Sequence, residues 1–182
     1  MTRNQLAARQ SVSKELPTFS GNHEDWPTFL QMFNSTTAMC GFSNEENIIR
    51  LQKSLKGKAY DIVRARLTHP ANVPGVIRTL KLMFGQPEAI IHSLISKVSA
   101  FPTLKEDKLD TLVEFALNVD NLCVTVDACE LEDYMYNVSL LHHLVSKLPP
   151  TLKLDWARYR QGLLRVNLAT FGNWIYSIAE AV

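Results

Sequence analysis

The chain has 182 residues and a formal net charge of +1, and its hydrophobic (46%) and charged (20%) fractions are close to the averages for globular proteins. This length allows one ordinary domain or two small ones. Only seven glycines are present, which disfavours an all-β fold and phosphate-binding loops, and no apolar run approaches the ~20 residues that span a bilayer. We therefore expect a soluble all-α protein of the cytoplasm, with no membrane partner.

The N-terminal end is predicted to contain no helix. Residues 1–14 are polar and carry little apolar surface, so we expect a flexible arm there. Pro17 biases Leu16 away from helix and Gly21 favours a turn, so the run Leu16–Gly21 is predicted to be a short extended segment.

Apolar residues then recur at helical spacing through the first half of the chain. The helices expected here are 23–40, 43–55, 58–67 and one that runs through Ile77 and Leu80 to Phe84. Ser43 and Glu46 have the spacing of a capping box, and Gly85 is expected to end the last of these helices as its C′ residue.

The second half is predicted to contain longer helices. They begin with one that starts at Pro87 and stops at Phe101-Pro102, followed by 106–129, 132–148, 151–161 and a last one from about Thr170. Because the break at Gly85-Gln86-Pro87 separates two sets of apolar residues, we expect a two-lobed helical bundle. Its lobes are 15–86 (N-terminal) and 87–182 (C-terminal).

Three aromatic residues of the first helix lie on one face. Trp26, Phe29 and Phe33 follow the i, i+3, i+7 pattern, which favours core anchors of the N-terminal lobe over a ligand cage.

A basic region and an acidic region nearly cancel in the net charge. Residues 50–81 include eight Lys and Arg residues and a single acidic residue, Asp61. The candidate contact residues in this region are Arg50, Lys53, Lys56, Lys58, Arg64 and Arg66. They could bind RNA phosphates, pair with an acidic surface of another subunit, or form an ordinary solvated face. Tyr60 is the only aromatic residue among them, so a stacking platform for single strands is not expected.

Nine Asp and Glu residues between 106 and 133 are opposed by Lys108 alone. Asp110 and Glu114 are the candidate acidic residues for a contact between subunits. A catalytic acid/base pair in this region is disfavoured, because no histidine, nucleophile or phosphate loop converges on it.

No motif typical of an enzyme or a metal site occurs. G-x-S-x-G, P-loop, dinucleotide-binding, H-E-x-x-H and aspartic-protease sequences are absent. His142 and His143 are adjacent and point about 100° apart on a helix, and Cys123 and Cys129 do not have zinc-site spacing. With Cys40, three cysteines are present, an odd number that indicates free thiols. We expect neither catalysis nor a metal or other cofactor.

Several short motifs resemble the Gag proteins of Bel/Pao retrotransposons. The opening is Leu16-Pro17-Thr18-Phe19-Ser20-Gly21 followed by Asp25-Trp26-Pro27 and Phe29. Downstream come Leu51-Gln52-Lys53-Ser54-Leu55-Lys56-Gly57-Lys58-Ala59, then Leu80-Lys81-Leu82-Met83-Phe84-Gly85, then Leu148-Pro149-Pro150 and Trp156. Their order and spacing carry the resemblance from about residue 15 to about 160.

This resemblance implies a two-lobed capsid related to those of Ty3/gypsy elements, retroviruses and Arc. Such capsids form hexamers and pentamers that enclose RNA in virus-like particles and contain no catalytic residue. The zinc knuckles, protease and reverse transcriptase of the family are not found here, which implies a capsid fragment or a descendant without knuckles. The alternative expectation is a domesticated module that binds a peptide or RNA without forming shells. In that case, the Leu16–Gly21 segment would fill a groove on the N-terminal lobe or leave it open.

Overall fold

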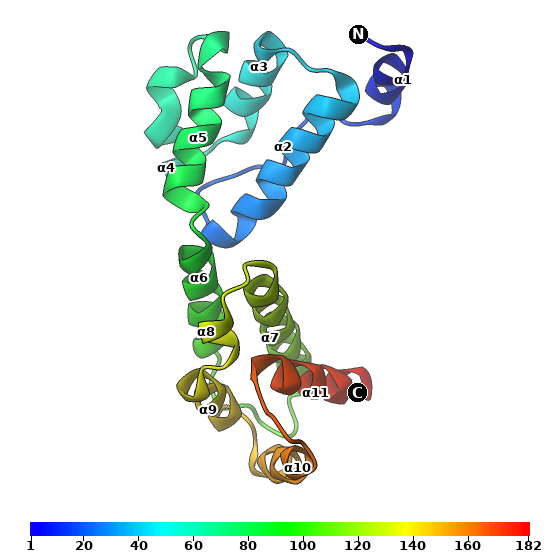
Figure 1. Cartoon of the computed structure of the whole chain (residues 1–182), viewed down its shortest axis with the longest axis vertical. Coiled ribbons are helices and arrows are strands. Elements are labelled where there is room, and N and C mark those ends of the chain that lie inside the picture. The colour runs from blue at the N-terminus through cyan, green and yellow to red at the C-terminus, as the bar shows by residue number, and fades with distance from the viewer. The chain divides into compact units, whose positions relative to one another are not determined.

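The computed structural model describes all 182 residues and confirms the all-α class, with eleven α-helices, three short 3-10 helices and no β-strand. The chain divides into two compact units, residues 1–90 and 91–182 (Figure 1). The division falls inside α6 (Pro87–Ser99), just after the break at Gly85-Gln86-Pro87. None of the helices combines the length and apolar character needed to cross a membrane.

The first unit contains five α-helices and three 3-10 helices before the start of α6. They are α1 (Arg3–Ser11), η1 (His23–Asp25), α2 (Trp26–Cys40), α3 (Asn44–Ser54), α4 (Gly57–Val63), η2 (Arg64–Arg66), η3 (Pro70–Asn72) and α5 (Val73–Phe84). The helix expected over 58–67 is therefore an α-helix that ends at Val63 and continues as a 3-10 turn.

Residues 1–14 are not the flexible arm that we expected, because α1 occupies most of them. Thr2 and Gln5 form a capping box at its start: the Thr2 hydroxyl accepts from the Gln5 amide, and the Gln5 side chain accepts from the Thr2 amide. The helix lies beside the C-terminal end of α2 (Figure 1). None of its residues is buried, which is why a search for apolar periodicity overlooked it.

The extended segment and the capping box at Ser43 are confirmed. Phe19 pairs with the α3–α4 turn as an isolated parallel bridge, in which its amide donates to Ser54 O (2.9 Å) and its carbonyl accepts from the Lys56 amide (3.0 Å). The Ser43 hydroxyl accepts from the Glu46 amide at 3.3 Å, so α3 begins where the sequence predicted.

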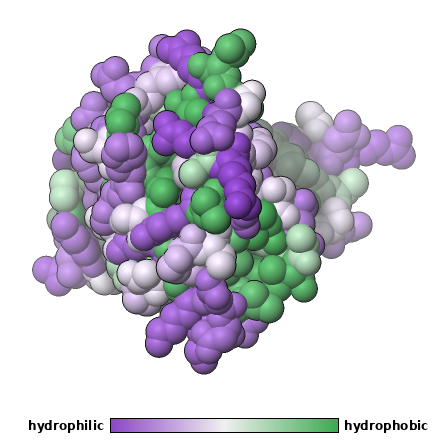
Figure 2. All heavy atoms as spheres, turned by 90° about the horizontal axis from the view of Figure 1, so that it is seen from below, coloured by the Kyte–Doolittle hydropathy of each residue, from purple (hydrophilic) through white to green (hydrophobic).

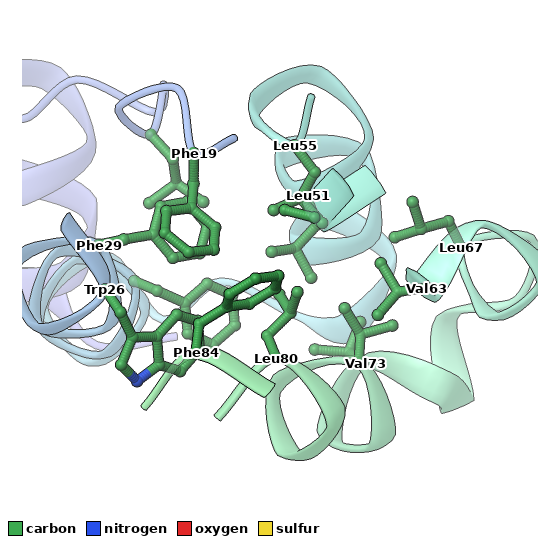
Figure 3. Packing of buried hydrophobic residues seen from close by; sticks show 14 of the residues in the cluster. Phe19, Trp26, Phe29, Leu51, Leu55, Val63, Leu67, Val73, Leu80 and Phe84 are labelled. Atoms are coloured by element: carbon green, nitrogen blue, oxygen red, sulfur yellow. The ribbon is translucent and has the colours of Figure 1, made fainter. Parts of the chain in front are cut away.

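An aromatic cluster forms one end of the core of this unit (Figure 3). The ring of Phe19 lies between 5.1 and 5.6 Å from the rings of Trp26, Phe29 and Phe84, measured between centroids. Trp26, Phe29 and Phe33 are all buried, in agreement with an anchoring role for this face of α2. Leucines and valines from α3, α4 and α5 continue the core away from the rings.

Gly85 ends α5 as the sequence predicted, but as its C-cap and not as its C′ residue. Its φ of −98° is open to any residue. A Cβ at this position would lie 2.5 Å from Nε1 of Trp26 and 2.8 Å from the carbonyl oxygen of Lys81. Glycine is therefore required here by the close approach of the tryptophan, not by the backbone angle.

The second unit contains most of α6 and five further helices. These are α7 (Leu109–Ala128), α8 (Glu132–Met135), α9 (Val138–Ser146), α10 (Pro150–Gln161) and α11 (Leu168–Glu180). The single helix expected over 132–148 is two helices, because Asn137 caps a new one: its side chain accepts from the amide of Leu140 at 2.9 Å.

The core of the second unit forms where α7 and α11 pack along each other. Gly172 allows this approach, since a Cβ there would lie 2.7 Å from Sγ of Cys123. Trp156 of α10 packs edge-on against Phe171 and contacts Trp174, each at a centroid distance of 5.2 Å. Each unit therefore has a core of its own.

Candidate interaction surfaces

The exposed basic residues of the first unit lie on either side of α4. Lys53 is near the end of α3, Lys56 and Lys58 stand at the start of α4, and Arg64 and Arg66 belong to the 3-10 turn that follows α4. All five are exposed, and none forms an ion pair within the chain. Because the seven residues of α4 rise only about 10 Å, these charges lie in one short stretch of the first unit. We call these five residues the basic surface.

Two local features hold this surface in place. The bridge from Phe19 to the α3–α4 turn fixes the backbone of Lys56, whose side chain remains exposed. At the other end, the Arg66 guanidinium lies over Gly75 of α5, where a Cβ would come within 3.1 Å of its Nη1. Arg78 is exposed one turn further along α5 and extends the positive charge.

Arg50 does not belong to this surface, although the sequence placed it there. It is only 6% exposed, and its guanidinium donates to Lys14 O (2.7 Å), Asn47 Oδ1 (2.8 Å) and Thr36 Oγ1. Its Cζ lies 4.4 Å from the centroid of the Phe42 ring. Burial lowers the pKa of Arg50. The residue therefore ties the link between α1 and the extended segment to α2 and α3, and it has no free donor pair for a phosphate.

The acidic candidates are exposed on α7. Asp110 and Glu114 are four residues apart, so they share one side of the helix, and neither forms an ion pair within the chain. The same side continues with Leu117 and Val124, which are 46% and 60% exposed. This face of α7 therefore combines two carboxylates with two uncovered apolar side chains.

Hydrophobic side chains also reach the surface where α10 lies. Figure 2 shows this end of the second unit, with hydrophobic patches between hydrophilic ones. Leu154 and Leu164 are 53% and 108% exposed, and Trp156 is the only buried residue of α10.

Cys123 is buried, and the two adjacent histidines lie at the surface. Burial raises the pKa of the Cys123 thiol to about 12, so it stays protonated and acts as a small packing group against Gly172. His142 and His143 are exposed on α9. No group of three or more His, Cys, Asp or Glu side chains could hold a metal ion.

Two further features are a groove, which the alternative expectation placed on this unit, and a cluster of polar contacts that the sequence did not predict. A groove of about 380 Å³ runs beside the extended segment and is lined by Lys14, Leu16, Ile49 and Lys53, among others. Arg9 of α1 makes a dense set of polar contacts at the end of α2. The spacing of Thr2 and Gln5 was the signal that could have revealed the helix that carries Arg9.

Comparison with known protein families gives a match over most of the chain. The model of a family described as a protein of unknown function, DUF1759, matches residues 19–163, which is most of the chain. No curated protein and no solved structure matches the chain significantly. The matched range begins at Phe19 of the extended segment and ends just after α10.

Proposed function

The chain belongs to the DUF1759 family, which is found in Gag and polyprotein regions of retrotransposons, and from this premise we propose that it is a structural capsid protein. In this proposal, copies of the chain self-assemble into the shell of a cytoplasmic virus-like particle that encloses RNA. The element would be of the Bel/Pao class, which the motifs from Leu16 to Trp156 support. The subunits would form hexamers and pentamers, and no residue would be catalytic.

The observation that carries the proposal is a pair of unpaired, oppositely charged surfaces on two separate units. The basic surface lies in the first unit, and Asp110 and Glu114 lie in the second. Shells require weak contacts repeated between identical subunits, so that wrongly placed subunits can dissociate. Complementary charges beside exposed apolar residues, such as Leu117, supply contacts of this kind.

RNA is the second partner of the basic surface in this proposal. Five cations without acidic partners would bind phosphates through the release of counterions, without sequence preference. RNA inside the shell would also reduce the repulsion between basic surfaces that meet around a ring.

The test compares particle formation by charge-reversed variants of the full chain, using electron microscopy and mass photometry with and without RNA. Reversal of Lys53, Lys56 and Lys58 to Glu should reduce particle yield. Reversal of Asp110 and Glu114 to Lys should reduce it as well, and the two sets together should restore part of it. Lys153→Glu and Glu180→Lys, which change exposed charges on α10 and α11, serve as controls and should leave the yield unchanged.

The outcomes separate the two roles of charge. If the acidic reversal has no effect while the basic reversal abolishes RNA retention, the subunit pairing is wrong and the RNA contact remains. If the wild-type chain stays monomeric under every condition, the shell is wrong.

The alternative function is a domesticated module that binds a peptide or RNA without forming a shell. The groove beside the extended segment is the observation in its favour. However, side chains of the segment are part of the core of the first unit, with Phe19 only 1% exposed and Leu16 9% exposed. The segment therefore does not leave a deep cleft open. A wild-type chain that binds RNA or a peptide as a monomer would favour this function.

A further inference from the structure

The polar contacts of Arg9 form a socket at the C-terminal end of α2. Its Nη1 and Nη2 donate to the two carboxylate oxygens of Glu46 at 2.8 and 2.9 Å, as a two-pronged pair. Its Nε donates to Cys40 O at 2.8 Å, and Nη2 also donates to Gly41 O at 3.1 Å. These carbonyls end α2, where the helix dipole is negative and favours a cation.

The ring of Phe42 adds an aromatic surface to the socket. The Cζ atom of Arg9 lies 5.1 Å from the ring centroid, within the range of a cation–π contact. Phe42 is 7% exposed and also contacts the buried Arg50, which fixes it to the core. The socket, defined by residues 40–42 and 46, is therefore supported by the folded unit and not by α1.

Gly41 lets α1 approach closely. Its φ of +60° ends α2 in the left-handed conformation, and a Cβ there would lie 2.6 Å from the side chain of Gln5. Gln5 also belongs to the capping box of α1, so the first turn of this helix lies against Gly41, whose carbonyl accepts from Arg9.

Helix α1 depends on the socket for its stability, whereas the socket does not depend on α1. Helix α1 has nine residues and buries none of them, and a helix of that length is not stable alone in water. The ion pair that holds it is partly exposed, with 21% of the Arg9 side chain and 37% of the Glu46 side chain accessible. Attachment of α1 is therefore reversible and sensitive to salt.

We propose that residues 40–42 and 46 form a docking site for the arginine-bearing helix α1, and that α1 of a second copy occupies it as well as α1 of the same chain. Exchange between copies forms the same contacts and requires no new surface. In dilute solution, the short connection from Val12 to Glu15 favours the helix of the same chain; at the high local concentration of an assembly, this advantage falls. The site does not depend on the formation of a shell.

The experiment empties the socket and offers the helix back as a peptide. The full-length Arg9→Ala variant is titrated with a fluorescent peptide of residues 1–12, and binding is followed by anisotropy. The peptide should bind this variant and should bind the wild-type chain, whose socket is filled, roughly ten- to a hundredfold more weakly, the range set by charge-assisted hydrogen bonds. Arg9→Lys keeps the charge and loses the fork, and gives a second receptor if the alanine variant does not fold.

Matched peptides identify the anchor. An Arg9→Ala peptide should lose binding, whereas an Arg3→Ala peptide of the same charge should bind like the native one, because Arg3 is exposed and makes no contact with the socket. Glu46→Gln, placed in the Arg9→Ala chain, keeps the cap of α3 and should abolish binding. Equal binding of the two mutant peptides, or no binding of the native peptide to either emptied chain, overturns the docking site.

Displacement tests the second copy. Unlabelled wild-type chain should release the peptide from the Arg9→Ala chain, because its own α1 competes for the socket. A chain that carries both Arg9→Ala and Glu46→Gln has neither anchor nor socket and should not release it. If the native peptide binds but the wild-type chain does not displace it, the site serves only the helix of its own chain and exchange between copies is wrong.

Discussion

Two basic side chains of α3 differ in their environment, one being buried and the other exposed. Arg50 and Lys53 are three residues apart on α3, yet Arg50 is buried among four acceptors and Lys53 is exposed. The sequence could not separate them, because a basic residue in a basic run is usually solvated. Arg50 is the exception because Thr36, Thr37, Asn47 and the carbonyl of Lys14 together satisfy its guanidinium.

The two residues should therefore respond differently to truncation. Arg50→Ala leaves buried acceptors without a donor, so we expect the free energy of unfolding to fall by roughly 1–3 kcal/mol. Lys53→Ala should change it by no more than about 0.5 kcal/mol. Denaturant unfolding of both variants measures the difference. Equal losses of unfolding free energy would contradict the structural role of Arg50.

Gly85 gives a second test at this scale. Gly85→Ala places a methyl group against the Trp26 ring and the Lys81 carbonyl, so we expect a loss of about 1–3 kcal/mol from overpacking. Gly162→Ala is the matched control: its nearest neighbour would be 3.7 Å away and its φ of −80° suits alanine, so it should be neutral or slightly stabilising. A melting temperature that is unchanged by Gly85→Ala would contradict the close approach of Trp26.

At the scale of elements, apolar spacing located the buried helices and overlooked the one held by polar contacts. Helices α2, α3, α5 and α7 bury a stripe of residues, which periodicity detects. Helix α1 buries nothing, so its only sequence signal is its capping box. The break before α9 was missed because apolar spacing continues across it, while the turn depends on a single side chain, that of Asn137.

Asn137 should therefore control the start of α9. We expect Asn137→Ala to reduce stability by about 1 kcal/mol, the usual cost of losing an N-cap. Asn121→Ala, on the exposed side of α7, should cost less because that side chain caps no helix. Thermal melts of the two variants provide the comparison, and equal losses would contradict a capping role.

The attachment of α1 should depend on pH. Hydrogen bonds from Arg9, followed by that from the Ser43 amide, lower the pKa of Glu46 below its ordinary 4.5. A carboxyl group with a lowered pKa stabilises the folded form above its unfolded pKa, and this contribution is lost as the pH falls through the folded value. We expect the amide resonances of Ala7 and Ala8 to shift toward unfolded positions below about pH 4.5. Glu46→Gln should remove this dependence, and wild-type resonances that follow those of Glu46→Gln at every pH would contradict it.

At the scale of the whole molecule, each unit has its own core, and the polypeptide passes from one to the other within α6. The sequence placed its boundary at Gly85-Gln86-Pro87 because a glycine and a proline mark a helix end. The compact units divide four residues later, after Ile90 in the first turn of α6.

The two units should fold separately. Fragments 1–86 and 87–182, which keep α6 intact, should each show a cooperative helical melt by circular dichroism. Absence of a cooperative transition in both fragments would mean that the units fold only together.

The ring of Phe19 packs against that of Phe84 at 5.4 Å, so the two ends of the first unit close the same core. During synthesis, the segment that carries Phe19 leaves the ribosome several seconds before Phe84, at roughly 5–20 residues per second. Throughout that interval, the nascent chain holds the rings of Phe19, Trp26 and Phe29 without the partner that covers them. We therefore expect chaperones to bind the nascent first unit before α5 is made and to lose this binding site once Phe84 packs against Phe19.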